Sequence, residues 1–122
     1  RNVIGVAKVY ETYVGSKAFQ PESEVFNTLQ AAGDEFGATT GRPRQCNWIS
    51  LPNLEKVINL NGVTNLVMNK MDILEGVGTW SVYADHKRAN LLTFQNKEQF
   101  CGYIKEYFPD VDIIFSGSPE RV

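Results

Sequence analysis

Three residues near the middle of the chain have the types and spacing needed to recognise a nucleobase. Asn69, Lys70 and Asp72 occur in the stretch VMNKMDIL. One carboxylate can accept hydrogen bonds from both the N1–H and the exocyclic amine of guanine, and adenine lacks this pair of donors. The aliphatic stem of Lys70 can lie along the base. The pattern is short, however, and a solvated Lys–Asp pair at a strand end is the simpler alternative.

A second candidate site is the loop GATTGRPR, residues 37–44. Pro43 fixes its own φ and favours extended backbone before it, so Arg42 and Arg44 are expected to project in the same direction. Each guanidinium group could then bind a carboxylate or a phosphate through two hydrogen bonds. Hydroxyl donors and close backbone approach come from four further residues, Gly37, Thr39, Thr40 and Gly41. The loop is either an anion site, for a dicarboxylate or a nucleotide, or a surface loop with two solvated arginines.

A third candidate is the small-residue turn SGSPER, which begins at Ser116 and either lies beside a ligand or simply precedes the terminus. His86 has no acidic partner at a readable spacing, so we expect it to be solvated or satisfied rather than catalytic. Cys46 and Cys101 stand outside any C-x-x-C motif, and a single histidine cannot complete a zinc site with them. Two reduced, partly buried thiols are expected, although the sequence leaves a disulfide open.

Alternating strand and helix patterns must position these motifs. Strands are predicted over NVIGVAKVYETYV, VTNLVMNK (63–68, buried on both faces), TWSVYADH, ANLLTF and VDIIFSG (111–115). Three helices are predicted: SEVFNTLQAAGDEF, which begins at Ser23; SLPNLEKVINLNG, which ends at Gly62; and NKEQFCGYIKEYF, which ends before Pro109. In the second helix, one face is formed by Leu54, Val57, Ile58 and Asn61. Residues 37–48 are predicted to be a loop. This order indicates an α/β fold, a layered and mostly parallel sheet with flanking helices. Ligands bind at the carboxyl ends of such strands. Residues 69–72, called the tetrad below, and SGSPER both lie at such ends.

Composition narrows the function classes. The 122 residues fit one domain, and a net charge of −2 with interspersed charges gives no basic surface for nucleic acid. Apolar runs are too short to span a membrane, and a cytoplasmic location is expected. The phosphate loop G-x-x-x-x-G-K-[ST] does not occur, which argues against a small GTPase-like protein. The chain starts in a strand pattern without Met, which suggests a piece of a longer polypeptide.

The string GDEFGATTGRPRQCNW, followed by INLNGVTNLVMNKMDILEG, resembles the adenylosuccinate synthetases. VAKVYETYVGSKAFQPE and YIKEYFPDVDIIFSGSPER resemble the same family, so the likeness covers nearly the whole chain; it is weakest over residues 77–95, which are shorter in this sequence. The resemblance implies that residues 1–122 form a single C-terminal portion of a larger, P-loop-like nucleotide-binding α/β fold.

The resemblance also implies a reaction. Such enzymes ligate L-aspartate to IMP in the AMP branch of purine biosynthesis, using GTP and Mg²⁺: GTP phosphorylates the 6-oxygen of the purine, and the aspartate amine displaces that phosphate. The full enzyme is expected to be a homodimer with no membrane or nucleic-acid partner. The phosphate loop, the catalytic Asp, the catalytic His and the expected Mg²⁺ ligands do not appear in this sequence. No catalytic or metal residue is therefore assigned to the chain, which is expected to be inactive alone.

Carried over by motif, the resemblance assigns site residues. The aspartate loop 37–45 would bind aspartate and IMP through Ala38, Thr39, Thr40, Gly41, Arg42, Pro43 and Arg44; Val14 in YVG would contact the inosine nucleotide. Arg44 would also reach GTP. The strand end 69–72, with Lys70, Met71 and Asp72, and the turn 116–119, with Ser116, Gly117, Ser118 and Pro119, would hold guanine. That turn is one residue longer than usual, so the serine that meets the base is open, and the family usually has Thr where Asn69 stands.

Two alternatives are kept. One is a phage-type variant that acts on a deoxyguanylate-like acceptor, in a family branch where some members take an adenine nucleotide as donor. The other is a non-catalytic nucleotide-binding module derived from the enzyme. In either case, a truncated sheet would expose an apolar edge and favour self-association.

Overall fold

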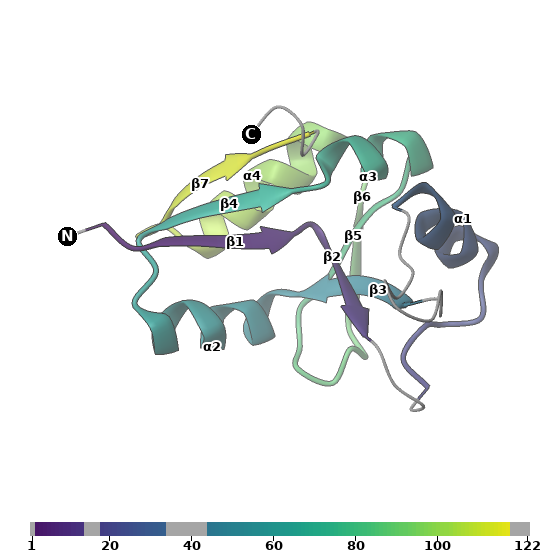
Figure 1. Cartoon of the computed structure of the whole chain (residues 1–122), viewed down its shortest axis with the longest axis horizontal. Helices are drawn as coiled ribbons and strands as arrows, with labels where there is room; N and C mark the ends of the chain where they lie inside the picture. Colours follow the sequence, from purple (N-terminus) through teal and green to yellow (C-terminus); the bar gives the residue numbers. More distant parts are fainter. Residues whose placement is uncertain (1, 14–17, 34–43, 118–122) are drawn as a thin grey trace.

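The computed structural model describes residues 2–13, 18–33 and 44–117 (Figure 1). The elements in chain order are β1 (Ile4–Lys8), β2 (Tyr10–Tyr13), α1 (Glu24–Ala32), β3 (Gln45–Ser50), α2 (Leu51–Asn61), β4 (Asn65–Asn69), α3 (Met71–Val77), β5 (Trp80–Tyr83), β6 (Leu91–Phe94), α4 (Lys97–Tyr107) and β7 (Asp112–Phe115). The predicted α/β fold with flanking helices is confirmed.

The strands form two sheets. The first has the order β1-β4-β7 and is parallel throughout. The second has the order β2-β3-β5-β6, in which β3 and β5 are parallel and the two outer pairs are antiparallel. The single strand predicted at the start of the chain is divided between the sheets at Val9, which is fully buried and donates its backbone N–H to the carbonyl of Asn69 at 3.1 Å. The sequence did not predict this division into two sheets.

Local signals fixed most helix ends where they were predicted. Ser23 occupies the N-cap position of α1 with extended backbone, although its side chain makes no capping hydrogen bond. Gly62 ends α2 in the left-handed conformation at φ 64°, which glycine adopts without steric cost. The side chain of Asn96 caps α4 by accepting the N–H of Gln99 at 2.9 Å, and Pro109 follows that helix.

Two local predictions were wrong, and two further features were not predicted. Residues 45–48 belong to β3 rather than to a loop, because Cys46, Asn47 and Trp48 are buried between neighbouring elements. Helix α3 begins at Met71, within residues 69–72, and packs against α1; no helix was predicted there. Val57, which was predicted on one face of α2 with Ile58, is 53% exposed, whereas Ile58 is buried. Strand β4 buries only alternate side chains, those of Leu66 and Met68, rather than both faces.

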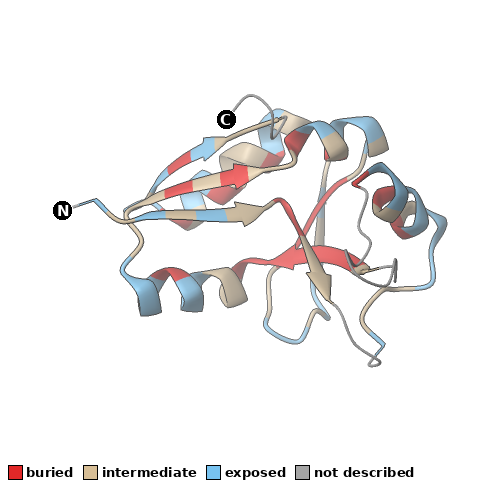
Figure 2. Ribbon diagram, viewed as in Figure 1, coloured by how far each residue is buried: buried red, intermediate tan, exposed pale blue. Residues whose placement is uncertain are grey.

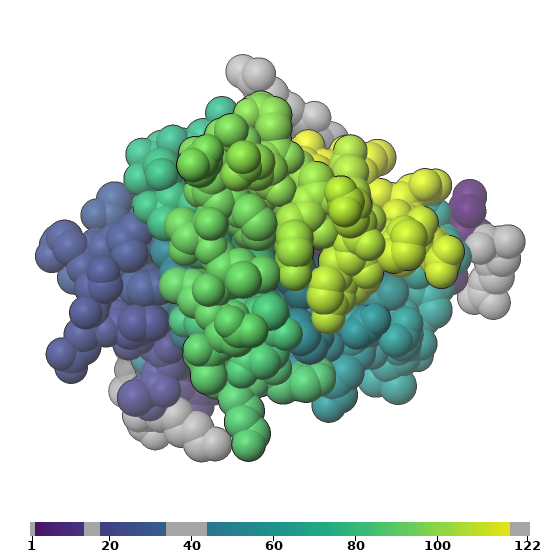
Figure 3. Space-filling model, turned by 180° about the vertical axis from the view of Figure 1, so that it is seen from behind, coloured from purple at the N-terminus to yellow at the C-terminus, as the bar shows by residue number. Residues whose placement is uncertain are grey.

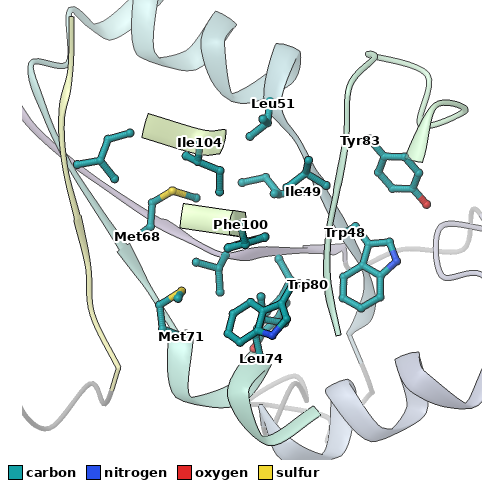
Figure 4. Packing of buried hydrophobic residues seen from close by; sticks show 14 of the residues in the cluster. Trp48, Ile49, Leu51, Met68, Met71, Leu74, Trp80, Tyr83, Phe100 and Ile104 are labelled. Atoms are coloured by element: carbon teal, nitrogen blue, oxygen red, sulfur yellow. The ribbon is translucent and has the colours of Figure 1, made fainter. Parts of the chain in front are cut away.

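The hydrophobic core lies between the sheets and α4. Figure 4 shows Met68 of the parallel sheet near Phe100 and Ile104 of α4, with Trp80 of the mixed sheet beside Phe100. The rings of Trp80 and Phe100 are 5.3 Å apart. Figure 2 shows the buried residues concentrated in β3 and β5, at the centre of the molecule.

No helix among the described residues is long and apolar enough to cross a membrane. The two cysteines are not bonded in a disulfide; Cys46 is buried and Cys101 is half-buried. Burial raises the pKa of the Cys101 thiol.

Candidate functional site

The tetrad and the C-terminal turn meet at the carboxyl ends of two adjacent parallel strands. Strands β4 and β7 pair in register from Asn65 with Asp112 to Met68 with Phe115. Two further backbone hydrogen bonds extend this pairing, because Ser116 N–H donates to the carbonyl of Met68 at 2.8 Å and Met71 N–H donates to the carbonyl of Ser116 at 3.0 Å. The first residue of α3 and the first residue of the turn are therefore joined through the backbone.

The carboxylate predicted to read the base lies against that turn. Asp72 is exposed in the first turn of α3, and a Cβ placed on Gly117 would lie 3.9 Å from the Cβ of Asp72. Lys70 joins strand to helix with a φ of 70°, a left-handed conformation that is uncommon for residues other than glycine and clusters at functional sites. The structure brings Lys70, Asp72, Ser116 and Gly117 together.

Asn69, just before Lys70, carries an unsatisfied polar atom. Its Oδ1 is buried and has no hydrogen-bond partner. Such atoms are rare, because each costs about 1–3 kcal/mol when it loses water without a replacement. No sequence pattern could show this, since the burial of a single atom is decided by the tertiary structure. The orphaned oxygen indicates a place where a donor from another group is expected.

Met71 is placed differently from its neighbours. Its side chain is 4% exposed and belongs to the core, and its N–H is used by Ser116. Any contribution of this residue to a ligand is therefore confined to its backbone. Ser118 and Pro119, the other two predicted residues of the turn, lie outside the described residues.

The two segments predicted to bind substrates, Val14 and the aspartate loop, adjoin the same end of the mixed sheet. Tyr13, the residue before Val14, pairs with Gln45, the residue after Arg44. Arg44 is half-buried, and its carbonyl accepts a hydrogen bond from Gln30 Nε2 at 2.6 Å. The chain leading to Val14 and the chain leaving the aspartate loop therefore meet at this point. Val14 itself, and Ala38, Thr39, Thr40, Gly41, Arg42 and Pro43, lie outside the described residues.

Side-chain amides fasten the segment after Val14 to β3. Gln45 Oε1 accepts the N–H groups of Phe19 and Gln20, at 2.8 and 3.0 Å. Gln20 Oε1 in turn accepts the N–H of Cys46 at 2.9 Å, and Asn47 Nδ2 donates to the carbonyl of Phe19 at 2.9 Å. These side-chain amides form hydrogen bonds with backbone groups that no neighbouring strand pairs with, which explains why polar residues are tolerated in β3. Residue types alone suggested a loop at this position, and the partners became visible only in three dimensions.

Helix α1 links the two candidate regions. It packs against α3, which carries Asp72, and against β3, which follows Arg44. Figure 1 shows α1 and α3 side by side at one end of the molecule, with the start of β3 close to α1. The guanine turn and the described end of the aspartate loop thus share one end of the fold.

A cleft of about 380 Å³ lies elsewhere, between β2, the end of β1 and α2. Its polar lining includes Lys8, Glu11 and Ser50. Both carboxylate oxygens of Glu11 have partners within the protein: Oε1 accepts the N–H of Ser50 at 2.8 Å, and Oε2 pairs with Arg88 at 2.7 Å. Arg88 also lies over the ring of Phe19, at 4.9 Å from its centroid. These contacts hold the hairpin between β5 and β6 against β2, and sequence reasoning missed them because the partners are 77 residues apart.

His86 is satisfied as predicted. Its Nδ1 lies 2.6 Å from Asn53 Oδ1, and the residue is exposed. Within the described part of the chain, no group of three or more His, Cys, Asp or Glu side chains could hold a metal ion. No Mg²⁺ ligand is assigned among the described residues, and no step of the chemistry is assigned to a metal ion.

Comparisons with known proteins show first which fold the chain shares and then which family it belongs to. The fold is similar to that of the fully ligated adenylosuccinate synthetase from Plasmodium falciparum, with a TM-score of 0.76 and 20% identity; the match covers 98% of this chain and 38% of that one. The family model of the adenylosuccinate synthetases matches residues 1–106. The chain belongs to the adenylosuccinate synthetase family.

Curated relatives agree with this placement. The adenylosuccinate synthetase of Bdellovibrio bacteriovorus is 47% identical over 88 residues, which are 68% of this chain and 20% of that protein. That of Halothermothrix orenii is 37% identical over 105 residues, 84% of this chain and 24% of that protein. That of Thermotoga maritima is 49% identical over 76 residues, 61% of this chain and 19% of that protein. The chain spans about a fifth of the length of the curated relatives it matches.

Proposed function

We propose that this chain carries the guanine-recognition elements and the aspartate-binding loop of an enzyme that ligates L-aspartate to IMP at the expense of GTP. The observation that carries the proposal is the backbone hydrogen bond from Met71 to Ser116, which places the Ser116–Gly117 turn beside Asp72 at the ends of β4 and β7. Family membership supplies the reaction class, and the placement of Arg44 at the same end of the fold supports one shared site.

Asp72 would select the base. Its carboxylate is exposed and can accept from N1–H and the exocyclic amine of guanine together. The half-buried Lys70 would lay its stem along the ring, and the turn would close over the other side. Gly117 has no side chain to fill the space next to Asp72, which leaves room for a flat base.

Arg44 would contribute a cation to the substrate end. A guanidinium group binds a carboxylate through two parallel hydrogen bonds, which suits L-aspartate. The other loop residues proposed for aspartate and IMP are Val14, Ala38, Thr39, Thr40, Gly41, Arg42 and Pro43. The proposed contacts to GTP are completed by the backbone of Met71 and by Ser118 and Pro119.

The chain holds no proposed catalytic residue, so it should not turn over by itself. Chain mixed with GTP, Mg²⁺, L-aspartate and IMP is expected to form no product. Turnover above a control without protein would contradict this division of labour.

The base-reading role of Asp72 can be tested by exchanging its hydrogen-bonding pattern. Xanthine carries a carbonyl where guanine has its exocyclic amine, so an amide can satisfy xanthine where a carboxylate cannot. Asp72→Asn is expected to lower the affinity for a guanine nucleotide by about tenfold or more and to raise the affinity for the xanthine nucleotide. Ligand-observed NMR titration measures both affinities and is suited to weak binding.

Asp112→Asn is the matched control, because Asp112 is an exposed aspartate at the opposite end of the same sheet. It should leave both affinities unchanged. Equal losses for the two variants, or an Asp72→Asn variant that still prefers guanine, would remove the basis of the proposal.

A further inference from the structure

Gln45, the first residue of β3, holds both ends of the segment between β2 and Phe19. Its backbone pairs with Tyr13, the last residue of β2. Its side-chain oxygen Oε1 accepts the N–H groups of Phe19 and Gln20, at 2.8 and 3.0 Å. The rings of Tyr13 and Phe19 are 5.5 Å apart. The chain therefore leaves β2 beside Gln45 and returns to the same residue.

Two further hydrogen bonds fasten the returning segment to β3. Gln20 Oε1 accepts the N–H of Cys46 at 2.9 Å, and Asn47 Nδ2 donates to the carbonyl of Phe19 at 2.9 Å. Cys46 and Asn47 are buried, so the loss of a hydrogen-bond partner at this position is expected to be costly. We call this set of bonded residues the amide clasp: Phe19, Gln20, Gln45, Cys46 and Asn47.

The amide clasp adjoins Arg44, the described end of the aspartate loop. The carbonyl of Arg44 accepts a hydrogen bond from Gln30 Nε2 of α1 at 2.6 Å, and the next residue, Gln45, belongs to the clasp. The backbone of Arg44 is therefore fixed from two sides. A guanidinium group that binds a carboxylate through two hydrogen bonds depends on its orientation, and hydrogen bonds behind it can maintain that orientation.

We propose that Gln45 and Gln20 are positioning residues for substrate binding. They act through the backbone of Arg44 and of Tyr13, the residue before Val14. The inference rests on the proposed function, in which Arg44 binds L-aspartate and Val14 contacts IMP. The guanine elements are held by a different set of hydrogen bonds, between β4, α3 and β7. Loss of the clasp should therefore weaken the binding of L-aspartate and IMP and spare the guanine nucleotide, whereas a clasp that only stabilised the fold would not distinguish among these ligands.

The first test removes the acceptor of Gln45. Gln45→Met keeps the length of the side chain but leaves the N–H groups of Phe19 and Gln20 without their partner. Ligand-observed NMR titration of the 122-residue chain measures the affinities for L-aspartate, IMP and GDP. Relative to the parent, the variant should bind L-aspartate and IMP more weakly by about tenfold or more, and its affinity for GDP should stay within about twofold.

A second pair of variants tests the clasp from its other side. Gln20→Met removes the acceptor of the Cys46 N–H and should repeat the selective loss. Gln20→Glu keeps an oxygen at that position, so it should restore the affinities for L-aspartate and IMP to within about threefold of the parent. Gln20 Nε2 otherwise donates only to Asn27 Oδ1 at an exposed position, where the amide of Asn27 can turn to donate instead. Should Gln45→Met fail to fold, the two Gln20 variants carry the test.

Gln99→Met is the matched control, because Gln99 Oε1 likewise accepts a backbone N–H, that of Gln95, at 3.1 Å. Helix α4, which contains Gln99, lies on the side of the molecule that is seen from behind in Figure 3. The substitution removes the same kind of acceptor outside the clasp and should leave all three affinities unchanged.

Three outcomes would overturn the inference. The first is that both methionine variants of the clasp bind L-aspartate and IMP as tightly as the parent. The second is an equal loss of affinity for GDP, which would assign the clasp a purely structural role. The third is a Gln20→Glu variant that binds as weakly as Gln20→Met, because the acceptor oxygen would then be irrelevant. A parent chain that binds GDP but neither L-aspartate nor IMP would instead contradict the substrate half of the proposed function and remove the inference with it, so the two failures are distinguishable.

Discussion

The two sheets of this protein differ in how deeply their strands are buried. In the mixed sheet, β3 and β5 are buried along almost their whole length, and every residue of β5 is buried. In the parallel sheet, burial alternates, and one side of β1 and β7 is exposed. The mixed sheet therefore organises the core, while the parallel sheet carries the candidate guanine site at its carboxyl edge and leaves an apolar face uncovered. Core packing and the candidate site are therefore concentrated in different parts of the molecule.

The largest effect is expected from the core behind the mixed sheet. Phe100 is fully buried, and its ring lies 5.3 Å from Trp80 and 6.2 Å from Phe94. Phe100→Ala should lower the free energy of unfolding by about 3–5 kcal/mol, because it removes transfer energy and leaves a cavity. Urea denaturation followed by tryptophan fluorescence measures this. The control, Phe100→Leu, should lower the free energy of unfolding by less. A decrease below about 1 kcal/mol for the alanine variant would show that the core is not centred on this ring.

A pair of substitutions within the parallel sheet sharpens the contrast between its faces. Leu66 is 3% exposed on the covered face, and Val6 is 67% exposed on the exposed face. In the isolated chain, Leu66→Ala should cost about 2–5 kcal/mol of unfolding free energy, and Val6→Ala should change it by no more than about 0.5 kcal/mol. Chemical denaturation of both variants measures these free energies of unfolding. Similar costs would mean that the exposed face is already covered in solution.

The smallest effect concerns pH and the hairpin between β5 and β6. The backbone N–H of Asn90, with that of Ala89, lowers the pKa of Asp85 from its ordinary value of 3.8. Since the folded pKa is the lower one, the carboxylate stabilises the fold above the unfolded pKa, and this contribution is lost as pH falls through the folded pKa. Asp85→Asn should therefore be mildly destabilising at pH 7 and less so below about pH 4. Urea midpoints at pH 7 and pH 3 measure this; a difference that grows on acidification would contradict the assignment.

Local signals accounted for most of the fold that the sequence predicted. Gly62, Pro109 and the helical spacing of Phe100 and Ile104 act within a few residues, and the structure has the corresponding elements. The predictions that were wrong, and the exposure of Val57, depended on distant partners. Val57 follows the helical period of α2, yet that period cannot say which side of the helix another element covers. Strand β3 looked like a loop because Gln45 and Asn47 are polar, and their partners lie around Phe19, some 25 residues earlier.

The candidate site divides in the same way. The resemblance named Lys70, Asp72, Ser116 and Gly117, and the structure places them together. It could not indicate that the side chain of Met71 is buried or that Asn69 Oδ1 lacks a partner, since both depend on how β4 meets its neighbours. The roles predicted for these residues stay predictions until a nucleotide is titrated.

The sequence by itself determined the chemistry that is available: a carboxylate at a strand end, a guanidinium after a glycine-rich loop, and the family to which both belong. These follow from residue type and short spacing, which need no knowledge of distant contacts. The tertiary structure alone decided that the strands ending at Asn69 and Phe115 are neighbours, and that Val6 and Ile114 share an uncovered face. Register between strands far apart in the chain is set by packing of the whole molecule, so no local pattern encodes it.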